Sequence, residues 1–517
     1  MHIYDTIQTS TPPLAWFVLF LTGMARISET LLFVPHPNRQ KVGKIKKNFF
    51  FLKKTGVRAF KTREWESDMK HVAKKTISML IAFAMAIAIP FTFTACGKKS
   101  TLLNPGKPTT LTMWHVYGEQ VDSPMNAYIE QFNSTVGKEK GIVINVTLMS
   151  NASQIGKKLK DAQTDKAGSK EMPDLFFCHS SDARSLGANN LLNWNDYFSA
   201  AELGAFVPDF LSDGTVDGNL SVFPVSKSTY MLFIAGGVFD RFAAANNVSL
   251  SDLATWKGFF AVAGKYYEWS GGKPFCAIDY LIRLAELCAI SDGEEIVYKD
   301  GWYGADNAAL ITAYDMFTTS IAKGHIVVSD LYSNTQVMTG QTCAGIGSSA
   351  SVLYYNDEIT YPDNTSETMN LKVLPMPQQS GKQKVATQSG VGLCAYKTTD
   401  VKAEAATVFA KWFTEEQRNT EFVLSTGYMP VRTGAFDKIG DNSFRSEAYR
   451  NLYKSLSLTV ANCTFKKEPS FDGYYTKVYA LYEKIRNIQS TLEQRYEKGA
   501  TCEQLVEEME AALIGSK

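Results

Sequence analysis

Strand and helix patterns alternate over residues 111–178, and this alternation constrains the fold of the 517-residue chain more than any other feature. Residues 111–114 alternate as a strand, and apolar residues over 125–132 recur at the spacing of one helix face. Two further strands are predicted at 142–148 and 174–178. Because strands joined by helices at this spacing form right-handed crossovers, the sequence predicts an α/β fold with a mostly parallel sheet.

Ligands of such open sheets bind beyond the carboxyl ends of the strands. Trp114 and Tyr117 stand at the end of the first predicted strand, and His179 to Asp182 follow the third. The sequence therefore predicts that these residues share one rim of a cleft.

Two later segments continue the alternation of strands and helices. Residues 385–396 form a glycine-rich strand region, and Asp400 is predicted to cap a helix with an apolar stripe over 401–413. At the C-terminus, residues 501–504 form a capping box ahead of the last amphipathic helix.

The charge of the chain is unevenly distributed. The whole chain has a formal charge of +1, yet residues 1–95 carry 14 basic and five acidic side chains. The remaining residues therefore carry 39 basic and 47 acidic side chains. A basic front on an acidic body indicates a targeting segment and argues against a nucleic-acid partner.

The pattern of a secretory signal lies at residues 69–95. A short cationic stretch precedes eleven uncharged apolar residues at 79–89, which are too few to span a bilayer. Small residues then lead to Cys96, as in a bacterial lipobox, with Phe93 where Leu is more usual. We predict that Cys96 is lipidated and becomes the mature N-terminus, the alternative being a buried helix that ends in an ordinary cysteine.

The residues on either side of this signal are not expected to belong to the fold. Residues 1–68 are interpreted as an upstream extension before a start at Met69, and an unusually long leader is the alternative. Residues 96–107 are polar with Pro and Gly, and they predict a flexible tether.

Motifs for metal, cofactor or nucleophilic chemistry do not stand out. Seven cysteines remain beside Cys96, without a C-x-x-C pair, and those in apolar runs are expected to pack as small hydrophobes. They cannot all pair within the chain, although individual disulfides stay open. A lone G-x-G-x-x-A match at 345–350 is a weak dinucleotide signal, so we predict no metal and no cofactor.

Several segments together resemble a known family. Residues 112–118, 126–133, 142–146, 173–177, 223–224 with 230–233, 255–256 and 405–432 are similar to segments of extracellular solute-binding proteins of carbohydrate ABC importers. Their order and spacing, together with the lipobox, carry the resemblance over essentially the whole mature chain. Ile-Ala-Gly-Gly replaces the Tyr-Asn pair that is usual in the family after Tyr230.

The resemblance implies a periplasmic-binding-protein-like type II fold, in which a ligand cleft lies between two α/β lobes joined by a hinge. We expect lobe 1 at 108–224 and 385–430, and lobe 2 at 225–384 and 431–517. It also implies that the protein is a monomer on the outer face of the bacterial cytoplasmic membrane, not an enzyme, and that it delivers a sugar to ABC permease subunits.

Candidate ligand residues are those that suit a sugar and lie at predicted strand ends or hinge crossings. Aromatic rings cover the C–H faces of a sugar, while carboxylates, guanidinium groups and backbone amides bind its hydroxyl groups. The candidates are Trp114, Tyr117, Ser180, Ser181, Asp182, Tyr230, Asp279, Gly347, Ser348, Ser389, Gly390, Gly427, Tyr428 and Arg432.

Each candidate also has a structural alternative. Core packing would equally explain Trp114, helix capping would explain residues 180–182, and tight turns would explain the Ser and Gly pairs. A surface position is the alternative for Asp279. For Trp256, Trp269 and Trp302, packing within a lobe is the expected role.

Three functions compete with sugar capture. The same fold could bind glycerol phosphate or a phosphodiester, for which Arg432 and the Ser/Gly turns would serve. A surface glycoside hydrolase with a carboxylate pair is the alternative of another class, because acidic residues are abundant. A purely adhesive lipoprotein is the third.

Overall fold

The computed structural model describes residues 101–115, 117, 123–148, 152–330, 332–471 and 473–515, which belong to one compact unit over 99–517. Cys96, the predicted signal at 69–95 and the upstream residues 1–68 lie outside the described residues, and the predicted tether is described only from Thr101. Within the described part, no helix is long and apolar enough to cross a membrane.

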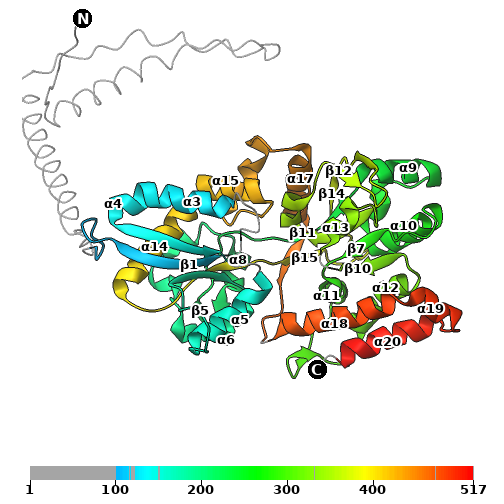
Figure 1. The fold of residues 1–517 in the computed structure, drawn as a ribbon, viewed down its shortest axis with the longest axis horizontal. Coiled ribbons are helices and arrows are strands. Elements are labelled where there is room, and N and C mark those ends of the chain that lie inside the picture. The colour runs from blue at the N-terminus through cyan, green and yellow to red at the C-terminus, as the bar shows by residue number, and fades with distance from the viewer. Residues whose placement is uncertain are drawn as a thin grey trace, which may run out of the picture. The chain divides into compact units, whose positions relative to one another are not determined.

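A four-stranded sheet of order β16-β3-β1-β2 forms the centre of lobe 1 (Figure 1). Its strands are β1 (Thr109–His115), β2 (Ile142–Leu148), β3 (Leu175–Cys178) and β16 (Gly392–Ala395). β1 is parallel to both β2 and β3, and β16 is antiparallel to β3. The predicted mostly parallel α/β sheet is thus confirmed, and its last strand comes from a distant part of the chain.

Helices on both faces cover this sheet. α3 (Pro124–Phe132) starts with a proline in its first turn and buries Met125, Ile129 and Phe132, as its periodicity predicted. The other segments of lobe 1 are the π-helical turn Asn133–Gly137, α4 (Lys138–Lys140), α5 (Ala152–Gln163), α6 (Ser180–Leu186), α7 (Ala200–Leu203), α8 (Pro208–Asp213), α14 (Asp400–Phe413), α15 (Glu416–Thr426) and the hairpin of β4 (Thr215–Val216) and β5 (Asn219–Leu220). The start of α16 (Thr433–Lys438) also bonds to residues 205 and 206 of lobe 1, whereas the expected boundary at 430 assigned this helix to lobe 2.

The cap of α14 differs from the prediction. Thr399, and not Asp400, is the N-cap, because Thr399 is extended and its hydroxyl accepts a hydrogen bond from the amide of Lys402. Asp400 instead occupies the first turn, where a negative charge faces the positive end of the helix dipole.

A mixed five-stranded sheet of order β10-β7-β11-β6-β14 forms the centre of lobe 2. The strands are β6 (Tyr230–Ile234), β7 (Cys276–Ile278), β10 (Ile326–Val328), β11 (Ala344–Ser348) and β14 (Lys372–Pro375). β10, β7 and β11 are parallel, whereas β6 is antiparallel to both of its neighbours.

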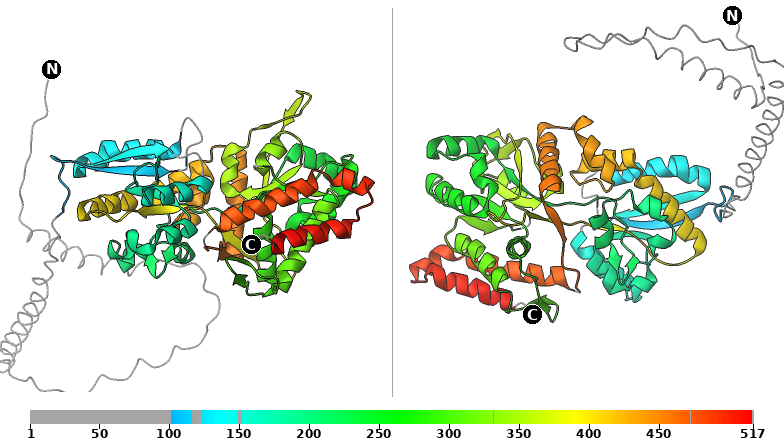
Figure 2. Two further views of the ribbon diagram at one scale, coloured as in Figure 1. Left: turned by 60° about the horizontal axis from the view of Figure 1, so that its bottom comes forward. Right: turned by 180° about the vertical axis from the view of Figure 1, so that it is seen from behind.

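The helices of lobe 2 surround its sheet, and two small hairpins lie at its edges; Figure 2 shows one of them, β12–β13, projecting from the lobe. The capping box predicted at 501–504 begins the last helix. The elements are α9 (Gly236–Asn246), α10 (Trp256–Trp269), α11 (Leu281–Asp292), α12 (Ala308–Ala322), α13 (Ser333–Met338), α17 (Glu447–Asn462), α18 (Tyr474–Gln489), α19 (Leu492–Glu497), α20 (Cys502–Ile514), β8 (Tyr298–Lys299), β9 (Trp302–Tyr303), β12 (Glu358–Thr360) and β13 (Ser366–Thr368).

Most large aromatic side chains pack inside the lobes. Trp256 and Trp302 are fully buried, as expected. Trp269 at the end of α10 packs against the rings of Phe242 and Tyr266 but is also 39% exposed. All seven described cysteines are free, and five of them are buried as small hydrophobes. Among these, the sulfur atoms of Cys178 and Cys394 lie 3.6 Å apart in the core of lobe 1.

Candidate ligand-binding cleft

Three segments of the chain run side by side where it passes between the two sheets. Ser228 and Ser389 exchange two backbone hydrogen bonds of 2.9 Å, and Lys227 and Met429 form a second antiparallel bridge. The first crossing is therefore held between the other two. Gly390 has φ +112°, a value that side-chain-bearing residues rarely adopt, so the second crossing turns at a position suited to glycine.

A two-stranded ladder of β15 (Val385–Gln388) and β17 (Thr464–Lys467) supports these crossings. The buried Arg283 of α11 donates hydrogen bonds to the hydroxyl of Thr387 and to the carbonyl groups of Lys466 and Lys467. Its charge is balanced by an ion pair with the buried Glu286. Arg283 thus fastens both strands of the ladder to lobe 2.

A narrow pocket of about 20 Å³, open to solvent, lies where both lobes meet the crossings. Lobe 1, the second crossing and lobe 2 all contribute to it, and nearly all of the contributing side chains are polar. Its lining residues are His179, Ser180, Ser181, Asp213, Ser389, Gly390, Glu468, Pro469, Ser470 and Tyr475.

Side chains of the two lobes touch inside this pocket. The rings of His179 and Tyr475 lie 4.8 Å apart, and the Tyr475 hydroxyl is 3.4 Å from Nδ1 of His179. The same hydroxyl donates a 2.6 Å hydrogen bond to Glu468, which also accepts one from Tyr230. Burial raises the pKa of Tyr475 well above its ordinary value, so its hydroxyl stays protonated and donates.

The charged groups at the pocket are mainly carboxylates. Lys227, on the first crossing, is buried and forms an ion pair with Asp213, so its positive charge is already neutralised. Glu468 receives only hydroxyl donors in the contacts above. Among the described lining residues there is no Lys or Arg. The pocket therefore offers acceptors for hydroxyl groups and little attraction for an anion.

The predicted residues after β3 have two different roles. Ser180 and Ser181 line the pocket, and the Ser180 hydroxyl donates to the carbonyl of Asp213 at 2.8 Å. Asp182 accepts a hydrogen bond from the amide of His179 and caps α6. Helix capping, the structural alternative, thus describes Asp182.

Asp279, Gly347 and Ser348 lie at the cleft end of the second sheet, but they are occupied with one another and with neighbouring turns. The buried Asp279 accepts hydrogen bonds from both the amide and the hydroxyl of Ser333 and from Ser329. A side chain at Gly347 would collide with Asp279, and Ser348 caps the following 3-10 helix. These contacts indicate a structural role for Asp279.

Three predicted tyrosines, Tyr230, Tyr117 and Tyr428, pack against other aromatic rings. The ring of Tyr230 stacks on Tyr280 at 4.7 Å with an interplanar angle of 6°. Tyr117 and Tyr428 pack edge to face at 5.8 Å, and the Tyr117 hydroxyl is 3.1 Å from that of Ser226 on the first crossing.

Of the predicted residues, Ser180, Ser181, Ser389 and Gly390 line the pocket, and the other ten do not. Trp114 is 4% exposed and packs in the core of lobe 1, which was its structural alternative. Arg432 lies over the ring of Phe206 and donates to the carbonyl of Thr414, so it is engaged within lobe 1. Gly427 ends α15 with φ +78°, and a turn explains it.

Three exposed tyrosines near the cleft were missed from the sequence. Tyr332, Tyr354 and Tyr479 are 49%, 42% and 45% exposed. Burial raises the pKa of Tyr479, and the electrostatic influence of Tyr332 and Glu468 adds to this rise. The four-residue spacing of Tyr475 and Tyr479 on α18 was a usable signal, since residues so spaced share one helix face.

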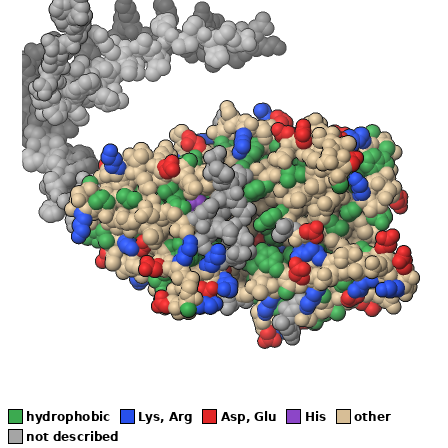
Figure 3. Space-filling model, in the orientation of Figure 1, with side chains coloured by type: hydrophobic (Ala, Val, Ile, Leu, Met, Phe, Trp, Pro, Cys, Tyr) green, Lys and Arg blue, Asp and Glu red, His purple; other side chains and the backbone are tan. Residues whose placement is uncertain are grey.

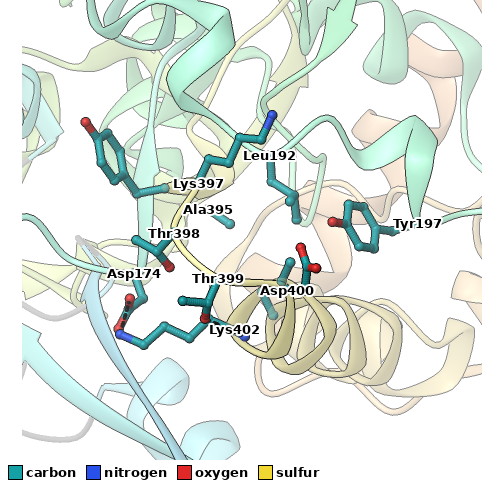
Figure 4. Close-up of a pocket in the computed structure, with 12 residues that line it drawn as sticks. Asp174, Leu192, Tyr197, Ala395, Lys397, Thr398, Thr399, Asp400 and Lys402 are labelled. Carbon is teal, nitrogen blue, oxygen red and sulfur yellow. Dashed lines mark hydrogen bonds and ion pairs between the residues drawn. The ribbon is translucent and has the colours of Figure 1, made fainter. Parts of the chain in front are cut away.

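A second cavity lies at the other end of the first sheet (Figure 4). Asp174 directly precedes β3, and Lys402 reaches it across the cavity in a 2.7 Å ion pair, while Thr112 donates to the same carboxylate. These groups satisfy one another and lie away from the cleft. The ion pair therefore has a structural role, which is to connect α14 to the sheet.

The exposed charges and the described acidic groups give no sign of a metal or a highly charged ligand. Figure 3 shows acidic and basic side chains interspersed over one face of both lobes. Among the described residues, no group of three or more His, Cys, Asp or Glu side chains could hold a metal ion. The side chains that line the pocket between the lobes are thus the observation from which we infer the class of solute.

The comparisons with known proteins agree with this geometry. The family model for bacterial extracellular solute-binding proteins matches residues 127–448. No curated protein matches the sequence.

Several solved structures share the fold. A cyclic alpha-maltosyl-1,6-maltose binding protein from Arthrobacter globiformis aligns with a TM-score of 0.58 and 16% identity, over 79% of this chain and 99% of its own. A substrate-binding protein from Listeria monocytogenes in complex with cycloalternan gives 0.60 and 14%, over 79% and 99%. UgpB from Mycobacterium tuberculosis, in complex with glycerophosphocholine, gives 0.55 and 17%, over 79% and 98%. The predicted two-lobed fold is thereby confirmed.

Proposed function

The chain belongs to the bacterial extracellular solute-binding proteins, and from this premise we propose that it captures a neutral sugar or oligosaccharide between its lobes for an ABC importer. Members of this family bind solutes and do not transform them, so the hydrolase alternative is set aside. Ligand contacts to both lobes would favour the closed arrangement, which the permease would recognise.

The observation that carries the proposal is the composition of the pocket between the lobes. Serine hydroxyl groups, a histidine and two carboxylates converge there from lobe 1, the second crossing and lobe 2. Such groups donate to and accept from sugar hydroxyl groups, and a solute held by all three parts would stabilise one lobe arrangement.

The exposed tyrosines near the pocket support the same ligand class. Tyr332 and Tyr479 expose large ring surfaces to solvent, and Tyr479 lies about one helical turn after the pocket residue Tyr475 on α18. Aromatic faces of this kind pack against the C–H faces of pyranose rings. More than one ring suits an oligosaccharide better than a single sugar unit.

A phosphate ester is the second candidate, because UgpB binds glycerophosphocholine with the same fold. The charges argue against it here. A phosphate requires cations or several amide donors, whereas Lys227 is already paired with Asp213, and Glu468 adds a negative charge. Arg432 is engaged elsewhere.

A binding assay with three probes tests the proposal. Maltotriose, cycloalternan and glycerophosphocholine are titrated into the purified protein by calorimetry and by thermal unfolding. A micromolar ligand at 100-fold excess should add about 2.7 kcal/mol to the free energy of unfolding. Binding of a saccharide supports the proposal, and binding of glycerophosphocholine alone would replace it by the phosphate-ester alternative.

Variants connect the binding to the pocket. Glu468→Gln should weaken saccharide binding by about 1.5–3 kcal/mol, since hydrogen bonds to a charged group contribute that much. Glu493→Gln, at an exposed position on α19, is the matched control. Equal affinities of the two variants would place the site elsewhere.

The membrane attachment is proposed from the sequence alone. Cys96 would carry the lipid that holds the protein at the outer face of the cytoplasmic membrane, through the tether at 96–107. Cys96→Ser should prevent incorporation of labelled fatty acid and release the protein from the membrane fraction. Continued labelling of the variant would exclude Cys96 as the attachment point.

A further inference from the structure

We propose that lobe 2 carries a second saccharide-binding site, beyond the amino ends of two of its strands, at the end of the sheet opposite the cleft. A cavity of about 280 Å³, open to solvent, lies there between α9, α10 and the β12–β13 hairpin. Its size is close to the lower end of the range of about 300–1,000 Å³ that is usual for small-molecule sites. The inference does not depend on the proposed function of the cleft.

The strand directions separate this cavity from the cleft. Lys273 and Thr342, which line the cavity, precede β7 and β11, whereas Asp279 and Ser348 stand at the other ends of these strands. A strand of five residues spans roughly 15 Å. A short saccharide in the cleft therefore cannot also occupy the cavity.

Aromatic side chains form one wall. The indole of Trp269 is 39% exposed, and it is held by ring contacts with Phe242 at 5.6 Å and Tyr266 at 5.7 Å. Tyr361 forms another part of the wall. A fixed, half-exposed indole beside a cavity provides the flat apolar surface on which a pyranose ring packs, at little cost in side-chain entropy.

The polar groups of the wall are fixed before any ligand binds. Arg241 donates to both oxygens of Glu367 at 2.7 and 2.9 Å, and Glu367 also accepts a hydrogen bond from the Tyr361 hydroxyl. These contacts connect α9 to the hairpin that Figure 2 shows projecting from the lobe. A rigid frame of donors and acceptors orients the hydroxyl groups of a sugar.

Lys273 and Gly340 complete the rim. The ammonium group of Lys273 lies 5.5 Å from the centre of the Tyr361 ring and donates to the carbonyl of Gly340 at 3.2 Å. Gly340 has φ +66°, and an added methyl group would lie 2.2 Å from the Tyr361 ring, so only glycine lets the ring close the wall.

The balance of charges favours a sugar over an anion or an apolar partner. One of the two cations, Arg241, is neutralised by Glu367, and the other already donates to a carbonyl group. The charged rim opposes a purely apolar occupant, since those groups would lose water without new partners. Alternating aromatic and hydrogen-bonding groups fit the C–H faces and hydroxyl groups of a pyranose.

Saturation-transfer NMR on the full-length protein tests this site, with maltotriose and the trimer of N-acetylglucosamine as probes. We compare the wild type with Trp269→Ala, with Lys273→Met as a second cavity variant, and with Tyr496→Ala, a tyrosine of similar exposure on α19, as the control. Glu468→Gln reports on the cleft. Melting temperatures check that each variant is folded.

In Glu468→Gln, in which binding at the cleft is weakened, at least one trimer should still bind. Adding Trp269→Ala should weaken this remaining binding about tenfold, as loss of a stacking contact does, while adding Tyr496→Ala should leave it unchanged. This result would hold even if the cleft bound no sugar. Equal saturation transfer to both trimers in Glu468→Gln with and without Trp269→Ala, or none in Glu468→Gln, would overturn the proposal.

Discussion

Asp279 provides a direct test of how the cleft end of lobe 2 is built. Its carboxylate is buried, and it accepts hydrogen bonds from Ser329 and from the amide and hydroxyl of Ser333. Burial raises its pKa from 3.8 to about 6, and the hydrogen bonds only partly oppose this rise. The folded protein therefore binds a proton at Asp279 more tightly than the unfolded chain does.

The sign and size of the effect follow from this difference in pKa. Between pH 3.8 and 6 the folded state holds more proton than the unfolded state, so the free energy of unfolding falls as the pH rises. A shift of about two units corresponds to about 3 kcal/mol, with the loss complete above pH 6. Below pH 3.8 both states are protonated and Asp279 contributes no pH dependence.

Asp279→Asn removes the titration while keeping the shape of the side chain. Urea unfolding of wild type and variant at pH 4, 5, 6 and 7 gives the difference in stability, in which other titrating groups cancel. We expect the wild type to lose about 2.5 kcal/mol relative to the variant between pH 4 and 7, because the unfolded carboxyl group is already partly ionised at pH 4. Asp357→Asn, at an exposed position, is the control and should give a flat difference. A flat difference for Asp279→Asn too would refute the reasoning.

Three further predictions concern the hinge, a turn and the thiols. Arg283→Leu should lower the free energy of unfolding by about 3–5 kcal/mol in thermal or urea denaturation, because Glu286 would remain buried without its partner; Arg283→Leu combined with Glu286→Leu should recover much of this loss. Gly427→Ala should cost about 1–3 kcal/mol, since its φ is +78° and the new methyl would lie 2.5 Å from a side-chain carbon of the 3-10 helix Ser349–Tyr354; an unchanged melting temperature would contradict this. In a thiol-labelling time course, Cys463 and Cys502 should react in the native protein, and the five buried described cysteines only after unfolding.

Local patterns made lobe 1 predictable from the sequence. The strand at β1, the helix at α3 and the strands at β2 and β3 each follow from a periodicity within a few residues, and parallel pairing follows from the helices between them. Choosing between Thr399 and Asp400 as the cap was not possible in this way, since both residues suit that position.

The pocket was harder to predict because it depends on long-range geometry. Ser180 follows β3 of the first sheet, so the carboxyl-end rule located it. Ser389 was predicted instead as part of a Ser-Gly turn whose amides could approach a ligand. Glu468 and Tyr475 reach the same pocket from a loop and a helix of lobe 2, where no local pattern distinguishes them from other surface residues. Arg432 was predicted to bind the ligand because its chemistry suits a sugar or a phosphate, but in the folded chain it packs over the ring of Phe206.

The late return of the chain to the first sheet also affects the order of folding. Cys178 of β3 and Cys394 of β16 are 216 positions apart, yet they lie on adjacent strands. At a synthesis rate of about 5–20 residues per second, roughly 10–40 s pass between the appearance of the two strands. During this time lobe 1 has an unpaired strand edge and cannot complete its core. A nascent chain of this topology stays incompletely folded in lobe 1 until β16 (Gly392–Ala395) has been made, after most of the sheet of lobe 2.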